Sequence, residues 1–168
     1  MVAQSLQERY APLGRCFGCG PANPSGLRIR SFEAADGAVV ADWRARPEHE
    51  AFEGFLNGGI LGTLVDCHAN WTAVAALIRR DDLAAAPSSV TVELAVRFRR
   101  PTPSGVPVRL EARPVELDGS RVTVEVRVRS GDVVTATGRA TFVAVGPDHP
   151  QEAVPRSEAD VPVGTDGR

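Results

Sequence analysis

The stretch that decides the fold is residues 57–80, which read NGGILGTLVDCHANWTAVAALIRR. Large apolar residues recur in it at the spacing of one helical face, and they predict an α-helix that packs against a sheet. That stripe is Ile60, Leu64, Trp71, Ala75 and Ile78. A second stripe, about 100° around the helix, is small or polar and holds Gly59, Thr63, Asp66, Asn70 and Ala73. Asn57 is a favoured helix N-cap, and the basic pair Arg79 and Arg80 suits the negative end of the helix dipole.

Two strands are predicted before this helix, at residues 27–32 and 38–43. They flank Asp36-Gly37, a turn signal that favours a β-hairpin. Residues 45–56 are expected to form a connecting loop that leads from the hairpin into the helix.

After Pro87 the hydrophobic period changes to two, which is typical of β-strands. Apolar residues alternate with polar ones in three runs: Val90, Val92, Leu94, Val96 and Phe98; then Val106, Val108 and Leu110; then Val122, Val124, Val126 and Val128. A last strand is predicted at residues 133–145, and the turn signals Asp118-Gly119 and Ser130-Gly131-Asp132 make the pairing antiparallel. One face of this sheet is rich in valine and the other is charged, so the helix is expected to cover the valine face. In this alternation Thr91 points away from the helix.

Composition points to one globular α+β domain. The chain has 168 residues, 43% of them hydrophobic and 24% charged, and this length suits one hydrophobic core. A net charge of −2 argues against nucleic acid or an anionic membrane as a partner. Without a long apolar stretch or a signal peptide, the expected compartment is the cytoplasm. We expect an N-terminal lead-in at residues 1–15, the domain at 16–145 and a disordered tail at 146–168.

Two features of the predicted helix are candidates for chemistry. The N–H groups of Gly58 and Gly59 follow Asn57 at the positive end of the helix dipole, where they can stabilise the oxyanion formed when water attacks a thioester. Asp66, on the stripe of small residues, can act as a general base or as a nucleophile. The structural alternatives are a capped helix start with glycines for close packing, and a solvated surface aspartate.

The cysteines allow a second kind of site. Cys16-x-x-Cys19, in a turn-rich block, is half of a zinc motif, and the sequence offers only Cys67 and His68 as a second pair. Because this ligand set is incomplete, the expectation is free thiols and no metal. Cys67 and His68 are adjacent on the helix and point about 100° apart, so they do not form a nucleophile and base pair. Cys67 is expected in the core, and the role of His68 stays open.

These residues together resemble the PaaI-type thioesterases of the hotdog-fold superfamily over about residues 16–145. The matching residues are Cys16-Phe17-Gly18-Cys19-Gly20, Asn23-Pro24, Gly26-Leu27, Phe52-Glu53-Gly54-Phe55, the run from Gly58 to Asp66, and the run from Val90 to Leu94 with Arg100-Pro101. The resemblance implies an antiparallel sheet wrapped around one long central helix. It also implies a homodimer, possibly paired again as a dimer of dimers, in which two subunits share active sites and no cofactor is needed.

The resemblance also implies roles for individual residues. Asp66 matches the catalytic carboxylate, Gly58 matches the glycine whose N–H polarises the thioester carbonyl, and Thr91 matches a residue that reaches the partner's site. Asn57 stands where the family commonly has histidine, and Cys67-His68 stands where it commonly has an acid. Candidate substrate contacts are Gly59, His68, Arg99 and Arg100, with the two arginines near the phosphates of CoA; without the resemblance, the arginines read as the charged face of an edge strand.

The function that follows is hydrolysis of an acyl-CoA thioester. A hydratase or dehydratase acting on acyl-CoA is a second possibility, and it requires His68 to enter the site. A non-catalytic acyl-CoA-binding domain is a third, and the asparagine at position 57 is the feature that favours it.

Overall fold

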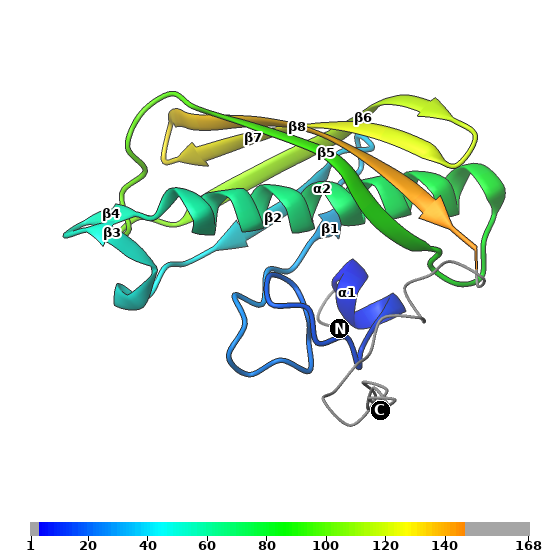
Figure 1. The fold of residues 1–168 in the computed structure, drawn as a ribbon, viewed down its shortest axis with the longest axis horizontal. Helices are drawn as coiled ribbons and strands as arrows, with labels where there is room; N and C mark the ends of the chain where they lie inside the picture. Colours follow the sequence, from blue (N-terminus) through cyan, green and yellow to red (C-terminus); the bar gives the residue numbers. More distant parts are fainter. Residues whose placement is uncertain (1–3, 147–168) are drawn as a thin grey trace, which may run out of the picture.

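The structure is a computed structural model that describes residues 4–146, with helices and strands arranged as in Figure 1. The tail predicted at residues 146–168 lies outside the described residues, apart from residue 146. The helical elements are α1 (Leu6–Tyr10), the short 3-10 turn η1 (Pro47–His49) and α2 (Gly58–Asp81). The strands are β1 (Phe32–Glu33), β2 (Val39–Trp43), β3 (Glu50–Phe52), β4 (Phe55–Leu56), β5 (Ser88–Phe98), β6 (Val108–Asp118), β7 (Arg121–Ser130) and β8 (Val133–Val145).

Six of the described strands form one antiparallel sheet in the order β1-β2-β6-β7-β8-β5. The predicted hairpin turns are confirmed, because Gly119 and Gly131 lie between successive strands with φ of 53° and 57°. These angles belong to the left-handed region that glycine adopts without strain. β3 and β4 make a separate small hairpin. The long strand β5 stands at one edge of the large sheet.

The long helix α2 runs across one face of this sheet (Figure 1). Its sheet-facing residues Leu61, Val65 and Leu77 join valines of β6 and β7 in the main core. The predicted helix start is confirmed, because the Asn57 side chain caps the first turn. The arrangement is the α+β hotdog fold that the sequence led us to expect.

The helix is covered on a second side as well, which the helical stripe did not predict. Trp71 and Ala75 pack with Leu6 of α1 and Val39 of β2 in a smaller cluster. In Figure 1, α1 lies on the opposite side of α2 from β7 and β8. Ala73, predicted on an open stripe, is instead buried in the main core. Because two layers cover α2, its exposed face is narrower than the sequence pattern indicated.

The strand predicted at residues 27–32 is wrong except at its last residue. Leu27 and Ile29 donate backbone hydrogen bonds to the carbonyls of Phe17 and Gly18, and therefore pair with the N-terminal loop. Arg28 has a φ of 53°, which no regular strand adopts. Leu27 and Ile29 are apolar because this segment is buried beneath the loop. The loop predicted at 45–56 contains η1, β3 and β4.

A β-bulge in β5 reverses the predicted orientation of Thr91. Thr91 pairs with Phe142 of β8 and Glu93 pairs with Thr141, so Val92 is an extra residue in the ladder. Directly paired residues share a face of the sheet, and Phe142 is buried in the core. Thr91 therefore faces its own helix, and the expectation that it points away is wrong.

Candidate functional site

Asp66 and Thr91 meet where α2 passes beneath the edge strand β5. The Thr91 hydroxyl donates a hydrogen bond of 2.9 Å to Asp66 Oδ1. Asp66 is half-buried, and Thr91 is exposed. The bulge at Val92 makes this contact possible, because it turns Thr91 toward the helix. The Asp66 carboxylate is thus held in place by a neutral donor at an accessible edge of the domain.

The surroundings of Asp66 favour a carboxyl group that holds its proton more tightly than usual. Burial raises the pKa of Asp66, the hydrogen bond from Thr91 lowers it, and negative charge on Cys16 raises it again. The net direction is upward from 3.8. A carboxylate with a raised pKa is a stronger base, which is the property that general-base catalysis near neutral pH requires.

The start of α2 separates the roles of its two glycines. Asn57 Oδ1 accepts hydrogen bonds from the N–H groups of Gly59 at 2.7 Å and Ile60 at 3.4 Å. The Gly59 N–H is therefore occupied by the cap, and the expectation that both glycine amides face the substrate is not met by this geometry. The Gly58 N–H donates to no acceptor among residues 4–146. It is the amide of this helix start that stands available to an oxyanion.

An open strip of helix surface connects Gly58 to Asp66. Gly62 lies between them at intervals of four residues, so all three lie near one face of α2. A side chain at Gly62 would meet nothing within 4 Å. The strip therefore leaves room for a substrate beside the backbone between the two groups.

A groove of about 370 Å³ lies at the Gly58 end of this strip. Gly58 and Leu61 of α2 line it together with Phe98, Arg99 and Arg100 at the end of β5. Neither arginine forms an ion pair within the part of the chain that the structure describes. The structure thus brings Gly58, Arg99 and Arg100 to one groove. A larger hollow of about 530 Å³ on the outer face of the sheet includes no residue of α2.

His68 lies in the core and is not part of this site. Its side chain is fully buried, with Nδ1 2.9 Å from Ser31 Oγ and Nε2 3.0 Å from the Val39 carbonyl. The carbonyl only accepts, so Nε2 carries the proton and Ser31 donates to Nδ1. Gln7 completes the network by bonding both the hydroxyl and the backbone N–H of Ser31. The candidate role of His68 in substrate binding is wrong, because its ring faces the layer formed by β2 and the N-terminal segment.

Folding stability should depend on pH through His68. Burial lowers the pKa of His68 to about 4, from 6.5. Between pH 4 and pH 6.5 the unfolded chain binds a proton at His68 that the folded chain does not. The free energy of unfolding is therefore highest above pH 6.5 and decreases as the pH falls through this range. We expect a loss of up to about 3 kcal/mol by pH 4 from this group. Urea unfolding of wild type and His68→Gln at several pH values measures it; an equal pH dependence in both proteins would contradict this assignment.

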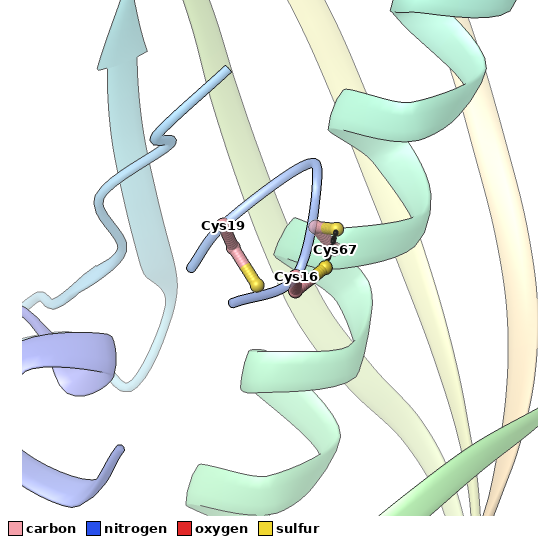
Figure 2. A group of neighbouring side chains, drawn as sticks. All are labelled: Cys16, Cys19 and Cys67. Carbon is pink, nitrogen blue, oxygen red and sulfur yellow. Dashed lines mark hydrogen bonds between the residues drawn. The ribbon is translucent and has the colours of Figure 1, made fainter. Parts of the chain in front are cut away.

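Three sulfur atoms from distant parts of the chain meet beside α2 (Figure 2). The Sγ atoms of Cys16, Cys19 and Cys67 lie within 4.8 Å of one another, and those of Cys16 and Cys67 are 3.7 Å apart. The thiols of Cys19 and Cys67 stabilise the Cys16 thiolate, which lowers the pKa of Cys16 and raises those of Cys19 and Cys67. Of the second pair that the sequence offered, Cys67 joins Cys16 and Cys19, whereas His68 lies apart from them in the core.

Comparisons with known proteins agree on one family. The family model described as "Thioesterase superfamily" matches residues 53–143, more than half of the chain. A thioesterase superfamily protein from Shewanella loihica is 28% identical, with a TM-score of 0.61; the match covers 75% of this chain and 98% of that one.

Two further solved structures share the fold at lower identity. A putative thioesterase related to phenylacetic acid degradation, from Ralstonia eutropha, is 21% identical over 81% of this chain and 99% of that one, with a TM-score of 0.63. The PaaI protein of E. coli is 15% identical over 71% of this chain and 81% of that one, with a TM-score of 0.60. No curated protein matches the chain. Among the described residues, no helix combines the length and apolar character needed to cross a membrane.

Proposed function

Since the chain belongs to the thioesterase superfamily, we propose that it hydrolyses an acyl-CoA thioester to a free acid and CoA. The observation that carries this proposal is the Asp66 carboxylate, held by Thr91 at an accessible edge with its pKa raised by burial. Gly58, with its N–H available, and the arginines Arg99 and Arg100 lie in one groove at the end of the same helix face. These groups supply a base, an oxyanion donor and positive charge for phosphate.

In the proposed mechanism Asp66 acts as a general base. It accepts a proton from water as the water oxygen bonds to the thioester carbon. Gly58 and Asp66 of one chain lie about 12 Å apart along α2, so the N–H that stabilises the negative charge on the carbonyl oxygen is that of Gly58 in the second copy of a dimer. The carbon–sulfur bond then breaks, and the proton on Asp66 passes to the departing CoA sulfur. Direct attack by the carboxylate on the thioester carbon is the alternative: the carbon–sulfur bond breaks, CoA leaves as its thiolate, and water hydrolyses the mixed anhydride that forms.

We propose that the working unit is a homodimer paired along β5. This strand is 11 residues long and stands at the edge of the sheet, yet Val92, Leu94 and Phe98 are 52%, 41% and 56% exposed. A long apolar edge strand is unusual in a protein that leaves it unpaired. Thr91 lies on the same strand, so a second copy seated there would cover the Asp66 site and limit the access of water.

A panel of acyl-CoA substrates tests the proposed activity. The purified protein is incubated with aromatic, short-chain and long-chain acyl-CoAs, and free CoA is measured with a thiol reagent. Hydrolysis of at least one class, abolished in Asp66→Asn, supports the proposal. Binding of acyl-CoA without release of CoA would instead support the non-catalytic binding domain. Asn57 favours that second function, because its side chain caps the helix where the family commonly has histidine.

Replacing Thr91 should move the pH profile and leave the mechanism intact. The Thr91 hydroxyl lowers the pKa of Asp66, so Thr91→Val should raise that pKa further. The acidic limb of kcat/KM, where activity falls as Asp66 becomes protonated, should therefore shift to higher pH than in wild type. The readout is kcat/KM against pH for both proteins, with Thr137→Val on the neighbouring strand β8 as the control. An unchanged acidic limb would mean that Asp66 is not the titrating base.

A further inference from the structure

We propose that Cys16, Cys19 and Cys67 bind one zinc ion, which fastens the loop after α1 to the helix α2. This inference reverses the expectation of free thiols, because that expectation rested on an incomplete ligand set. The structure supplies the third thiol from the helix (Figure 2).

The spacing of the sulfur atoms fits one metal ion. Zinc binds thiolate sulfur at about 2.3 Å, which puts neighbouring sulfurs of a tetrahedral site about 3.8 Å apart. Cys16 Sγ and Cys67 Sγ are 3.7 Å apart, and all three sulfurs lie within 4.8 Å of one another. Cys19 and Cys67 are buried, whereas Cys16 is exposed. The fourth position of the ion therefore opens toward solvent beside Cys16, where a water molecule binds.

The loop is shaped to hold its two cysteines against the helix. A side chain at Gly18 would collide with Cys67 Sγ and Thr63, so the loop backbone lies directly on the helical thiol. The Gly20 N–H donates to the Cys16 carbonyl at 2.8 Å, which closes the turn that carries both cysteines. These contacts hold the loop backbone against the helix where the three sulfurs meet.

A donor outside the three ligands orients one of them. Trp71 Nε1–H points to Cys19 Sγ at 3.3 Å. Hydrogen bonds of this kind stabilise a thiolate ligand and fix its direction toward a metal. His68 cannot replace any of the three thiols, because both of its ring nitrogens bond to Ser31 and Val39. The donor set of three thiolates selects a soft ion such as zinc.

The loop is held by backbone hydrogen bonds from Leu27 and Ile29, but its own large apolar side chains are not buried. Its larger apolar residues Leu13 and Phe17 are 84% and 52% exposed, so they contribute little buried apolar area. Loop-rich segments without a core of their own are commonly fastened by a metal or a disulfide. Because Cys67 follows Asp66 in the chain, an ion here also fixes the loop beside the carboxylate.

The test is metal analysis of full-length protein purified under reducing conditions without chelator. We expect about one zinc per chain in wild type and near zero in Cys16→Ser and Cys67→Ala. Phe17→Ala is the matched control, because it changes the same loop without removing a sulfur, and it should keep its zinc. Replacement by Co²⁺ in wild type should give intense sulfur-to-cobalt charge-transfer absorption. A zinc chelator should lower the Tm of wild type and leave the Tm of Cys16→Ser unchanged.

Other results would overturn the proposal. These are wild-type protein that takes up no zinc when supplied with it, zinc that persists in both cysteine variants, and cobalt protein without thiolate absorption. A thiol titration in denaturant and chelator that finds two of the three cysteines in a disulfide would also overturn it. The measurements on wild type decide the matter even if a cysteine variant fails to fold.

Discussion

Asp66→Asn should lower kcat for acyl-CoA hydrolysis by about 10²–10⁴-fold, the usual contribution of a positioned general base. The amide keeps the size of the carboxylate and can still accept the hydrogen bond from Thr91, but it cannot take a proton from water. Because burial raises the pKa of Asp66, the charged form is disfavoured by the fold, and the neutral amide should melt at or above the wild-type temperature. The measurements are turnover and thermal melting of the two proteins.

Asn57→Ala is the matched comparison for this prediction. It removes the helix cap, so it should cost about 1 kcal/mol of stability. Its kcat should fall much less, because the Gly58 N–H remains in place. Near-normal turnover in Asp66→Asn with abolished turnover in Asn57→Ala would identify Asp66 as a structural residue and overturn the mechanism.

The elements that the sequence predicted well are those whose signals are local. Tight turns at Gly119 and Gly131 join β6, β7 and β8, so pairing partners are neighbours in sequence. The long helix was predictable from the helical spacing of its apolar residues and from its asparagine N-cap. The segment at 27–31 failed because its apolar residues are buried under the N-terminal loop, a contact between non-regular segments that leaves no periodic signal.

The bulge in β5 could not be predicted from hydrophobic alternation. Val90, Val92 and Leu94 continue an unbroken period of two, yet Val92 is an unpaired extra residue and is 52% exposed. Alternation reports which residues are apolar, and it carries no sign that one of them is an extra residue in the ladder. The direction of Thr91, and so its bond to Asp66, depends on that one insertion.

The site residues that lie on one element could be predicted from the sequence. The contacts that depend on several elements could not. Gly58 and Asp66 lie on one helix, so their spacing shows in the sequence. The burial of His68 depends on Ser31 and Val39, and the cysteine cluster depends on where a distant loop crosses α2. Helix phase limits which side each residue faces, but tertiary packing decides what covers it.

Placing a charge on the edge strand should separate the proposed dimer and reduce its activity together. Leu94→Lys puts an ammonium group on β5 where apolar residues would be buried by a second copy, and burying that charge without a partner is costly. A penalty of about 3 kcal/mol weakens dimerisation on the order of 10²-fold. Leu117→Lys is the control, because Leu117 is 39% exposed, close to the 41% of Leu94, and lies on β6, which β7 and β8 separate from β5. Sedimentation at micromolar concentration should show dimers for wild type and Leu117→Lys and monomers for Leu94→Lys, with acyl-CoA hydrolysis lost only in the last. A monomeric wild type, or a Leu94→Lys protein that stays dimeric and active, would mean that β5 is not the interface.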